Sequence, residues 1–497
     1  MSRDKSSFSF DILAVDRASG VPMHRQLYEA LRSYVLQGRL GAETRLPPTR
    51  FLAQQLGVGR NTVIAAYDQL LAEGYIEARP GSGTWITALN RPIAKIRVAN
   101  DVSRNFDLSA RGRRIASHPP PQRTRDKINL HPGFPDAADF PFATWSRLLT
   151  RNARRPSADL LTYYDFAGDR RLREAIADYL GVARGVDCVA EQVIVVSGAQ
   201  AALDLIARIL MDEGDIAWME EPGYRGARSA LLGGGARLLP LRVSRQGWSL
   251  NDPDLRPARL IYVTPSCQWP LGTIMRMEER LQLLAIAERR NAFIIEDDYD
   301  GEYRFRGRSV PALRGLDRAE RVIYVGTFGK TMFSSLRLGF LVVPRTLAEP
   351  FARAISVTGQ FAPLLLQATL ADFIREGYFA AHLKRMRRLY ARRQEQFIEL
   401  CHQRLAQWMT VTENDSGMQV LGRFVFPFDD RAVAAAALAR GIDVQPVSIN
   451  YGHDEPEHGL LLGYAGLNGE QMMQAVTALR ATFQDLARTP ARREHRA

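Results

Sequence analysis

The sequence lacks the features of a secreted or membrane-bound protein. Its 497 residues include only three cysteines, which are far apart and follow no ligand spacing, so neither a disulfide framework nor a metal site is expected. No stretch approaches the roughly 18 continuous apolar residues that span a bilayer. The first residues also lack the apolar core of a secretory signal. We therefore expect a cytoplasmic protein without a membrane partner.

The basic charge of the chain is unevenly distributed. The net charge is +12, and residues 1–126 hold 19 Lys and Arg against 11 Asp and Glu, so the remainder carries only +4. Within residues 91–125, nine basic residues face two acidic ones. Such a segment favours contact with a polyanion through neutralised phosphates. A solvated spacer would have the same composition, so both interpretations remain open at this point.

Three regions of the chain differ in composition and in the periodicity of their apolar residues. Residues 20–88 are compact and periodic, residues 89–126 contain arginine-rich and proline-rich pieces, and residues 127–490 alternate helical patterns with short β-rich runs. We predict a first domain, a basic flexible linker and a second domain with these boundaries. In the second domain the runs "QVIVVSG", "RLIYVTPS", "AFIIEDD" and "RVIYVGTFGK" favour an α/β fold with a mainly parallel sheet. Such sheets bind ligands at the carboxyl ends of their strands.

A winged helix-turn-helix is predicted for the first domain. The segments "PMHRQLYEALRSYVLQG", "LPPTRFLAQQLGV" and "GRNTVIAAYDQLLAEG" each place apolar residues on one helix face. We expect Thr49 to cap the second helix and Gly74 to end the third. The predicted core positions are Leu27, Leu31, Tyr34, Val35, Leu52, Ala53, Leu56, Val63, Tyr67, Leu70 and Leu71. The segment "YIEARPGSGTWIT" predicts two strands joined by a glycine-rich tip.

The first turn of the third helix carries an Arg-Asn-Thr sequence, which suits a phosphate or a base edge. Residues 20–88 resemble the GntR family of bacterial transcription regulators. The resemblance implies that five residues contact a double-stranded DNA operator: Arg50, Arg60, Asn61, Thr62 and Gly83. Gly59 stands where the family usually has Ser or Thr, which removes a hydroxyl that would reach a phosphate. A winged helix that contacts only protein is the alternative.

A lysine lies in the loop "TFGKTMFSSLRLG" that follows a predicted strand of the second domain. A lysine amine can form a covalent Schiff base with a carbonyl compound such as pyridoxal 5'-phosphate (PLP). PLP also requires an anion at its ring nitrogen, a phosphate cradle and a flat side chain against the ring. Candidates for these roles occur at successive strand ends: Lys330, Asp297, Tyr299, Ala199, Gln200, Thr327, Arg337 and Tyr224.

The second domain resembles the fold-type-I aminotransferases over roughly residues 129–485, and the whole chain resembles the MocR subgroup of GntR regulators. The matches include "HPGFPDAADFPFATW", "EEPGY" and "LLLGYAGL". The resemblance implies a homodimer in which Lys330 forms an aldimine with PLP. It also implies that Asp297 pairs with the ring nitrogen, Tyr299 reaches the 3'-oxygen and Tyr224 stacks on the ring. The implied phosphate contacts are Ala199, Gln200, Thr327, Arg337 and, from the neighbouring subunit, Tyr163.

Two departures from the family pattern bear on the ligand. Leu461 stands where catalytic aminotransferases carry the arginine that binds the substrate α-carboxylate. Either Arg225 or Arg228 replaces that arginine, or the ligand is not an ordinary amino acid, since a buried carboxylate without a charged partner binds poorly. In "PSCQWPLG", Cys267 and Leu271 stand where the subgroup more often has His and Thr or Ser.

The leading hypothesis is a PLP-dependent transcription regulator whose second domain senses PLP, an amine or an amino acid through Lys330. At most weak transaminase activity is expected of it. Two alternatives remain: an active aminotransferase that carries a DNA-binding domain, and a DNA-binding protein whose second domain is a cofactor-free dimerisation scaffold. The set of Lys330, Asp297 and the phosphate contacts argues against the scaffold.

Overall fold

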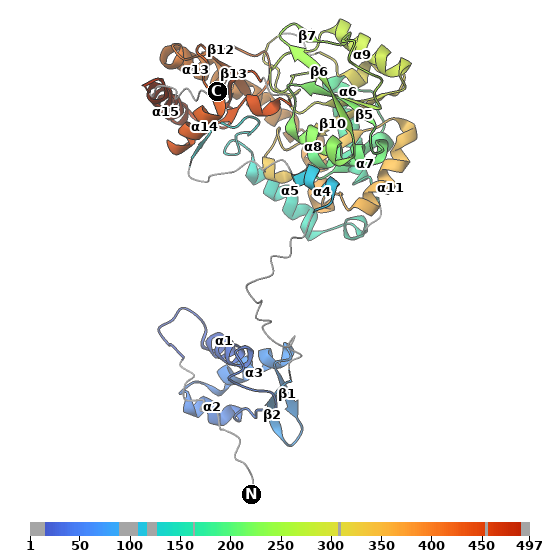
Figure 1. Cartoon of the computed structure of the whole chain (residues 1–497). Coiled ribbons are helices and arrows are strands. Elements are labelled where there is room, and N and C mark those ends of the chain that lie inside the picture. The colour runs from blue at the N-terminus through green and yellow to red at the C-terminus, as the bar shows by residue number, and fades with distance from the viewer. Residues whose placement is uncertain are drawn as a thin grey trace. The chain divides into compact units, whose positions relative to one another are not determined.

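The computed structural model describes residues 15–88, 108–116, 127–162, 165–306, 310–452 and 456–488. The chain divides into two compact units, residues 1–106 and residues 107–497, and each unit is described by itself. Figure 1 colours the first unit blue and the second from cyan to red. Within the described ranges, no helix is long and apolar enough to cross a membrane.

The first unit is a winged helix. Helices α1 (Met23–Leu36), α2 (Thr49–Gln55) and α3 (Arg60–Ala72) precede an antiparallel hairpin of β1 (Ile76–Arg79) and β2 (Gly83–Ile86). The three helices bury one apolar face each around a shared core, as the periodicity predicts. Two details differ from the prediction. Leu71 is 44% exposed, and Thr49 begins α2 without a capping bond from its side chain.

An eight-stranded sheet forms the centre of the second unit. Its strand order is β4-β11-β10-β9-β8-β5-β6-β7, and the pairs from β10 to β6 are parallel whereas β11 and β7 run antiparallel. The strands are β4 (Val193–Val196), β5 (Ile216–Glu221), β6 (Arg237–Ser244), β7 (Gly247–Trp248), β8 (Leu260–Val263), β9 (Phe293–Asp297), β10 (Val322–Thr327) and β11 (Gly339–Val342). The four β-rich runs of the sequence are β4, β8, β9 and β10, so this prediction is confirmed.

Helices cover both faces of this sheet because its buried strands alternate their side chains between two cores. Ile323 and Val325 of β10 pack into the core under α7, α8 and α11, whereas Tyr324 between them packs into the core under α6, α12 and α13. The helices are α5 (Phe142–Arg154), α6 (Arg170–Arg184), α7 (Ala199–Leu210), α8 (Arg225–Gly233), α9 (Met277–Arg289), α10 (Leu313–Leu316), α11 (Ala348–Thr358), α12 (Leu364–Arg375) and α13 (Tyr378–Leu405).

A smaller sheet follows α13. Its order is β12-β13-β16-β15, and α14 and α15 pack with it. The elements are β12 (Met409–Val411), β13 (Gln419–Phe424), α14 (Asp430–Ala439), β15 (Gln445–Pro446), β16 (Gly459–Gly463) and α15 (Gly469–Arg488). A separate two-residue pairing joins β3 (Ile128–Asn129) to β14 (Ile442–Asp443). This pairing fixes the segment that leads to Gly133.

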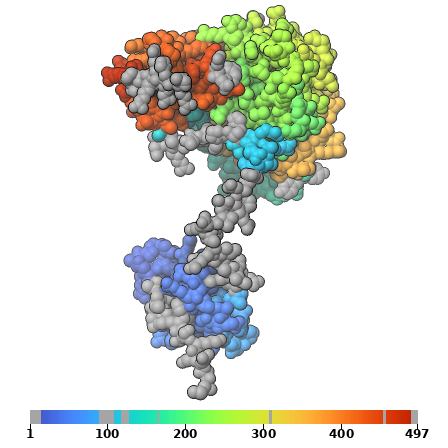
Figure 2. All heavy atoms as spheres, viewed as in Figure 1, coloured from blue at the N-terminus to red at the C-terminus, as the bar shows by residue number. Residues whose placement is uncertain are grey.

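A short helix occupies part of the segment expected to be a linker. Helix α4 (Ala110–Ala116) belongs to the second unit and packs on α8. Figure 2 shows it as a patch of cyan spheres on the surface of that unit. Arg114 lies 3.0 Å from the Glu213 carboxylate, and a Cβ on Gly233 would lie 3.1 Å from Ile115. The structure therefore differs from the prediction over these residues. The rest of the expected linker, 89–107 and 117–126, lies outside the described residues.

Candidate functional site

Most of the predicted cofactor contacts gather at the carboxyl ends of neighbouring strands. Asp297 ends β9, Thr327 ends the adjacent β10, and Val325 of β10 is the register partner of Asp297. Gly198 and the start of α7 follow β4, and Tyr224 follows β5. Parallel strands end at the same edge of a sheet, so residues that are far apart in the sequence meet there. Tyr163 lies outside the described residues.

Lys330 reaches toward the segment that contains Gly133. Its Nζ donates a hydrogen bond of 2.8 Å to the Gly133 carbonyl oxygen and lies 6.0 Å from the ring centroid of Phe134. Gly133 has φ +73°, and a Cβ there would lie 2.2 Å from Nζ. Only glycine therefore allows this approach without moving the amine. Gly133 is visible in the motif "HPGFPD", but the sequence analysis did not assign it to the site of Lys330.

Asp297 is a buried carboxylate with one oxygen left unpaired. The Tyr262 hydroxyl donates a 2.8 Å hydrogen bond to Oδ2, whereas Oδ1 has no hydrogen-bond partner within the described residues. Burial raises the pKa of Asp297 to about 6, and the Tyr262 hydrogen bond and the charge of Lys330 offset part of that rise. A buried polar atom normally has a partner. A protonated ring nitrogen would supply one, which fits PLP.

Groups that can bind an anion gather at the start of α7. The first N–H groups of a helix lack partners within the helix, and here they belong to the turn that contains Ala199 and Gln200. Arg337 adopts the left-handed conformation with φ +53°, and its guanidinium lies 3.5 Å from where a Cβ on Gly198 would stand. Because Gly198 has no side chain, the Arg337 guanidinium can lie beside the start of α7. The Thr327 hydroxyl accepts a 3.2 Å hydrogen bond from the Gly329 N–H.

Three aromatic side chains stand together beside these groups. The ring centroid of Trp269 lies 6.2 Å from that of Tyr224 and 5.8 Å from that of Tyr299, edge-on to both. The Trp269 indole N–H donates a 3.0 Å hydrogen bond to the Asn450 side-chain oxygen. Sequence reasoning missed Trp269 and Asn450. The tryptophan in the loop after β8 was a visible signal, whereas nothing marked the asparagine.

Leu461 belongs to an apolar cluster that contacts the aromatic group. It is fully buried on β16 and packs with Trp269, Leu421 and Val447. Arg228 lies 2.5 Å from the buried Glu221 carboxylate, so this charge already has a partner. Arg225 is half-buried, and burial together with the charge of Arg431 lowers its pKa.

The other departures also change the character of the pocket. Cys267 is buried, and burial raises the pKa of its thiol to about 12. It is therefore a neutral group at physiological pH. The side chain of Leu271 is half-buried beside the cluster of Trp269 and Leu461. Both replacements make the surroundings of the aromatic group less polar than His and Thr or Ser would.

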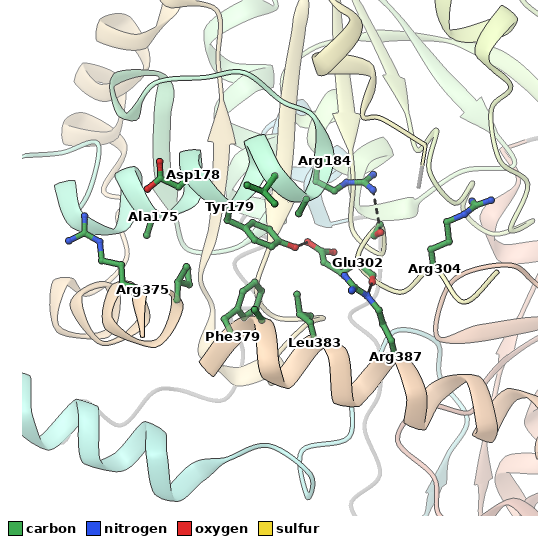
Figure 3. Close-up of a pocket in the computed structure, with 15 residues that line it drawn as sticks. Ala175, Asp178, Tyr179, Arg184, Glu302, Arg304, Arg375, Phe379, Leu383 and Arg387 are labelled. Carbon is green, nitrogen blue, oxygen red and sulfur yellow. Dashed lines mark hydrogen bonds between the residues drawn. The ribbon is translucent and has the colours of Figure 1, made fainter. Parts of the chain in front are cut away.

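Figure 3 shows a separate cavity of about 680 Å³ between α6 and α13. Tyr179 donates a 3.2 Å hydrogen bond to the Glu302 carboxylate, and Arg387 donates one to the Glu302 carbonyl oxygen. Lys330, Asp297 and Arg337 do not line this cavity. It is therefore distinct from the group of residues at the strand ends.

In the first unit, the predicted DNA contacts lie on accessible surface. Arg50, Arg60 and Asn61 are exposed, Thr62 is half-buried, and all but Arg50 belong to the first turn of α3. Gly83 begins β2 with φ +101°, and a Cβ there would lie 3.1 Å from the Arg45 guanidinium. The Arg45 guanidinium also lies 5.9 Å from the ring centroid of Trp85.

Two family models match the chain. Residues 23–86 match the model for bacterial regulatory proteins of the gntR family, and residues 125–479 match aminotransferase class I and II. The second match spans most of the second unit.

Similar proteins also cover nearly the whole chain. It is 56% identical over 474 residues to the probable rhizopine catabolism regulatory protein MocR of Rhizobium meliloti, covering 95% of this chain and 96% of that protein. It is 33% identical to the uncharacterized HTH-type transcriptional regulator YdeL of Bacillus subtilis (strain 168), covering 94% of this chain and 98% of that one. Among solved structures it resembles LysN, an alpha-aminoadipate aminotransferase from Thermus thermophilus complexed with N-(5'-phosphopyridoxyl)-L-leucine. The identity is 25% and the TM-score 0.68, covering 73% of this chain and 94% of that one.

Proposed function

The chain belongs to the MocR subgroup of the GntR family, and we propose that it is a PLP-dependent transcription regulator. The winged helix binds operator DNA, and the second unit senses PLP or an amine through Lys330. Such a regulator would act with the chromosome in the cytoplasm. The observation that carries the proposal is the buried, unpaired oxygen of Asp297 beside the Lys330 amine.

The residues at the strand ends could bind PLP. The aldehyde of bound PLP would react reversibly with amines. Asp297 would hold a proton on the ring nitrogen, and Tyr299 would bind the 3'-oxygen. Tyr224 would lie against the ring. Arg337, Thr327 and the N–H groups of Ala199 and Gln200 would bind the phosphate, with Tyr163 of the neighbouring subunit. Lys330 would be the catalytic residue, because its amine holds the cofactor.

The test combines spectroscopy with DNA binding in the full chain. The purified protein with PLP should absorb in the visible region and lose that band on borohydride reduction, and Lys330→Ala should show no such bound chromophore. Lys330→Ala should keep basal DNA binding but lose the response to ligand. Arg60→Ala should do the reverse, weakening operator binding at least tenfold while the chromophore stays. A ligand response that survives Lys330→Ala would refute the sensor.

We further propose that the effector lacks an α-carboxylate. The support is the apolar cluster around Leu461 and the ion pair of Arg228 with Glu221, because neither position offers a carboxylate an unpaired cation. Arg225 is the remaining candidate for such a contact. The second candidate function, an active aminotransferase, is favoured by the retained Lys330 and Asp297. Sustained turnover of amino donors with 2-oxo acids would establish it, and we expect at most weak activity.

Communication between the units is proposed to pass through α8 and α4. Tyr224 precedes the first residue of α8, and α4 packs near the other end at Gly233. A ligand shifts an equilibrium only as far as it binds two arrangements with different affinity. Contact of the effector with Tyr224 would move α8 and so change the docking of α4. Helix α4 leads back along the chain toward the winged helix.

A homodimer is proposed from an apolar surface beside the phosphate contacts. Leu161 is 72% exposed, and it lines one hollow together with Phe166 and Phe361, which are also exposed. The backbone carbonyl oxygen of Gln360, the residue before Phe361, accepts a 3.3 Å hydrogen bond from the Ser197 N–H next to the start of α7. Contiguous exposed apolar side chains mark protein interfaces. Leu161→Glu should lower the mass in light scattering from dimer to monomer, and Val182→Glu, at an equally exposed apolar residue elsewhere, should not.

A further inference from the structure

A buried amide lies on the face of the small sheet that meets the segment of Gly133. It belongs to Gln419, which is 3% exposed at the start of β13 and has Gly463 of β16 as its register partner. Opposed residues of antiparallel strands project on the same face of a sheet. A Cβ on Gly463 would lie 2.3 Å from the His131 carbonyl oxygen, in the segment that leads to Gly133. The Gln419 side chain therefore projects on the side of the segment that receives the Lys330 amine.

The same face of β13 borders the aromatic group of the proposed effector site. Leu421 lies two residues along the strand, so its side chain is on the same face as that of Gln419. Leu421 packs with Trp269 and Leu461 in the apolar cluster beside Tyr299. The Gln419 Nε2 donates a long hydrogen bond of 3.5 Å to the Tyr299 hydroxyl. Gln419 is thus a polar group at the end of an otherwise apolar wall.

One end of the Gln419 amide has no partner. Its Oε1 is buried and accepts no hydrogen bond from the residues that the structure describes. Rotation of the amide by 180° would exchange oxygen and nitrogen and still leave one end unpaired. A buried polar atom normally has a partner, as does the amide of Gln394, which is also 3% exposed and donates a 3.0 Å hydrogen bond to the Tyr464 hydroxyl. The free end of the Gln419 amide therefore calls for a polar group of a ligand.

A second unpaired oxygen lies near this amide. Asp300 Oδ2 accepts a 3.2 Å hydrogen bond from the N–H of Met418, the residue before Gln419, whereas its Oδ1 is buried without a partner in the described part of the chain. Burial raises the pKa of Asp300 to about 7, and the charge of Lys330 offsets part of that rise. Because burial disfavours the charged carboxylate, Asp300 suits a neutral polar partner better than a second cation.

We propose that Gln419 binds a hydroxyl group of the effector, which is then a hydroxylated amine. This inference rests on the proposed sensing of an amine through Lys330. A hydroxyl group both donates and accepts hydrogen bonds, so it pairs with either end of the amide. A hydrocarbon in the same place would leave the amide unpaired. A second ammonium group would lose its hydration against a neutral amide and an apolar cluster.

The test titrates the PLP-bound full chain with three amines of similar size and follows the absorbance of PLP. Propylamine, ethanolamine and ethylenediamine end in a methyl group, a hydroxyl group and a second amine. In Gln419→Met the affinity for ethanolamine relative to propylamine should fall about five- to tenfold, which is the effect of one hydrogen bond between neutral groups. Each ratio is compared with that of the parent, so the different basicities of the amines cancel. The control Gln394→Met removes an equally buried amide and should leave the ratio within twofold of the parent.

An unchanged ratio in Gln419→Met would overturn the hydroxyl contact, and so would a larger loss for ethylenediamine than for ethanolamine. If no amine perturbs the absorbance of PLP in the parent, the proposed sensor fails together with this inference. Perturbation by all three amines without an effect of Gln419→Met refutes the hydroxyl contact alone.

Thermal unfolding of the cofactor-free chain gives a second readout. Gln419→Met replaces an amide with an unpaired end, whereas Gln394→Met breaks the 3.0 Å hydrogen bond to the Tyr464 hydroxyl. Gln419→Met should therefore lower the melting temperature less than Gln394→Met does. Equal losses would show that the Gln419 amide is already paired inside the protein, and the proposal would then be wrong.

Discussion

The side-chain amine of Lys330 lies 2.8 Å from the carbonyl oxygen of Gly133, at a position where a Cβ would come within 2.2 Å of that amine. The two residues lie almost two hundred positions apart in the sequence. The proposed catalytic amine is thus positioned by a backbone carbonyl group. Residue 133 has to lack a side chain for the amine to lie there.

Gly133→Ala should displace Lys330 and weaken PLP binding at least tenfold, measured by titration of the chromophore. Gly441→Ala is the matched control, because Gly441 has φ +83° and a Cβ there meets nothing within 4 Å. Both variants should lose about 1–2 kcal/mol of unfolding free energy from the left-handed backbone. Equal PLP affinity in the two variants would contradict the steric role of Gly133.

Asp297→Asn should stabilise the cofactor-free chain at high pH while weakening PLP binding. Burial raises the pKa of Asp297 from 3.8 to about 6, so ionisation is harder in the folded state than in the unfolded state. The cost appears as pH rises from 3.8 and is complete above the folded pKa. It amounts to about 2–3 kcal/mol. Urea unfolding should therefore show a gain for Asn at pH 8 and little gain at pH 4. A gain independent of pH would refute the assignment.

Leu461→Arg should make the pocket respond to amino acids. A buried guanidinium gives an α-carboxylate its missing partner, and we expect at least a tenfold rise in apparent affinity for amino acids relative to amines without a carboxylate. Perturbation of the PLP absorbance by each ligand measures the ratio. Leu461→Met keeps the apolar wall and should leave the ratio unchanged. A parent protein that already favours amino acids would show that another cation, such as Arg225, binds the carboxylate.

Glu213→Gln should weaken the coupling between effector and DNA without changing either affinity alone. Glu213 is the acid that pairs with Arg114 and approaches Arg111 of α4, and such exposed pairs contribute about 0–1 kcal/mol. The ratio of DNA affinities with and without effector should therefore fall by up to about fivefold. Asp212→Asn removes a neighbouring exposed acid and should leave the ratio as it was. An equal ratio in both variants would exclude α4 docking as the route.

The sequence predicted what depends on local pattern. The β-rich runs became β4, β8, β9 and β10, and the periodic segments became α1 and α3. Leu71 was wrongly predicted to be buried. It lies next to the core position Leu70, and the helical periodicity alone does not separate the last residue of the buried face from the first exposed one. Gly133, Trp269 and Asn450 were missed for another reason: they join the site from distant segments, and only tertiary contacts bring them to Lys330 and Tyr224.

The proposed choice of effector and the proposed transmission of its signal use different parts of the second unit. Position 461 is on β16 of the small sheet, whereas α8 and α4 pack beside the large one. Exchange of one buried side chain can therefore retune which molecule is recognised and leave the output machinery intact. To make the protein respond to a new effector, one would therefore vary residues of β16 and its neighbours and leave α8 and α4 unchanged.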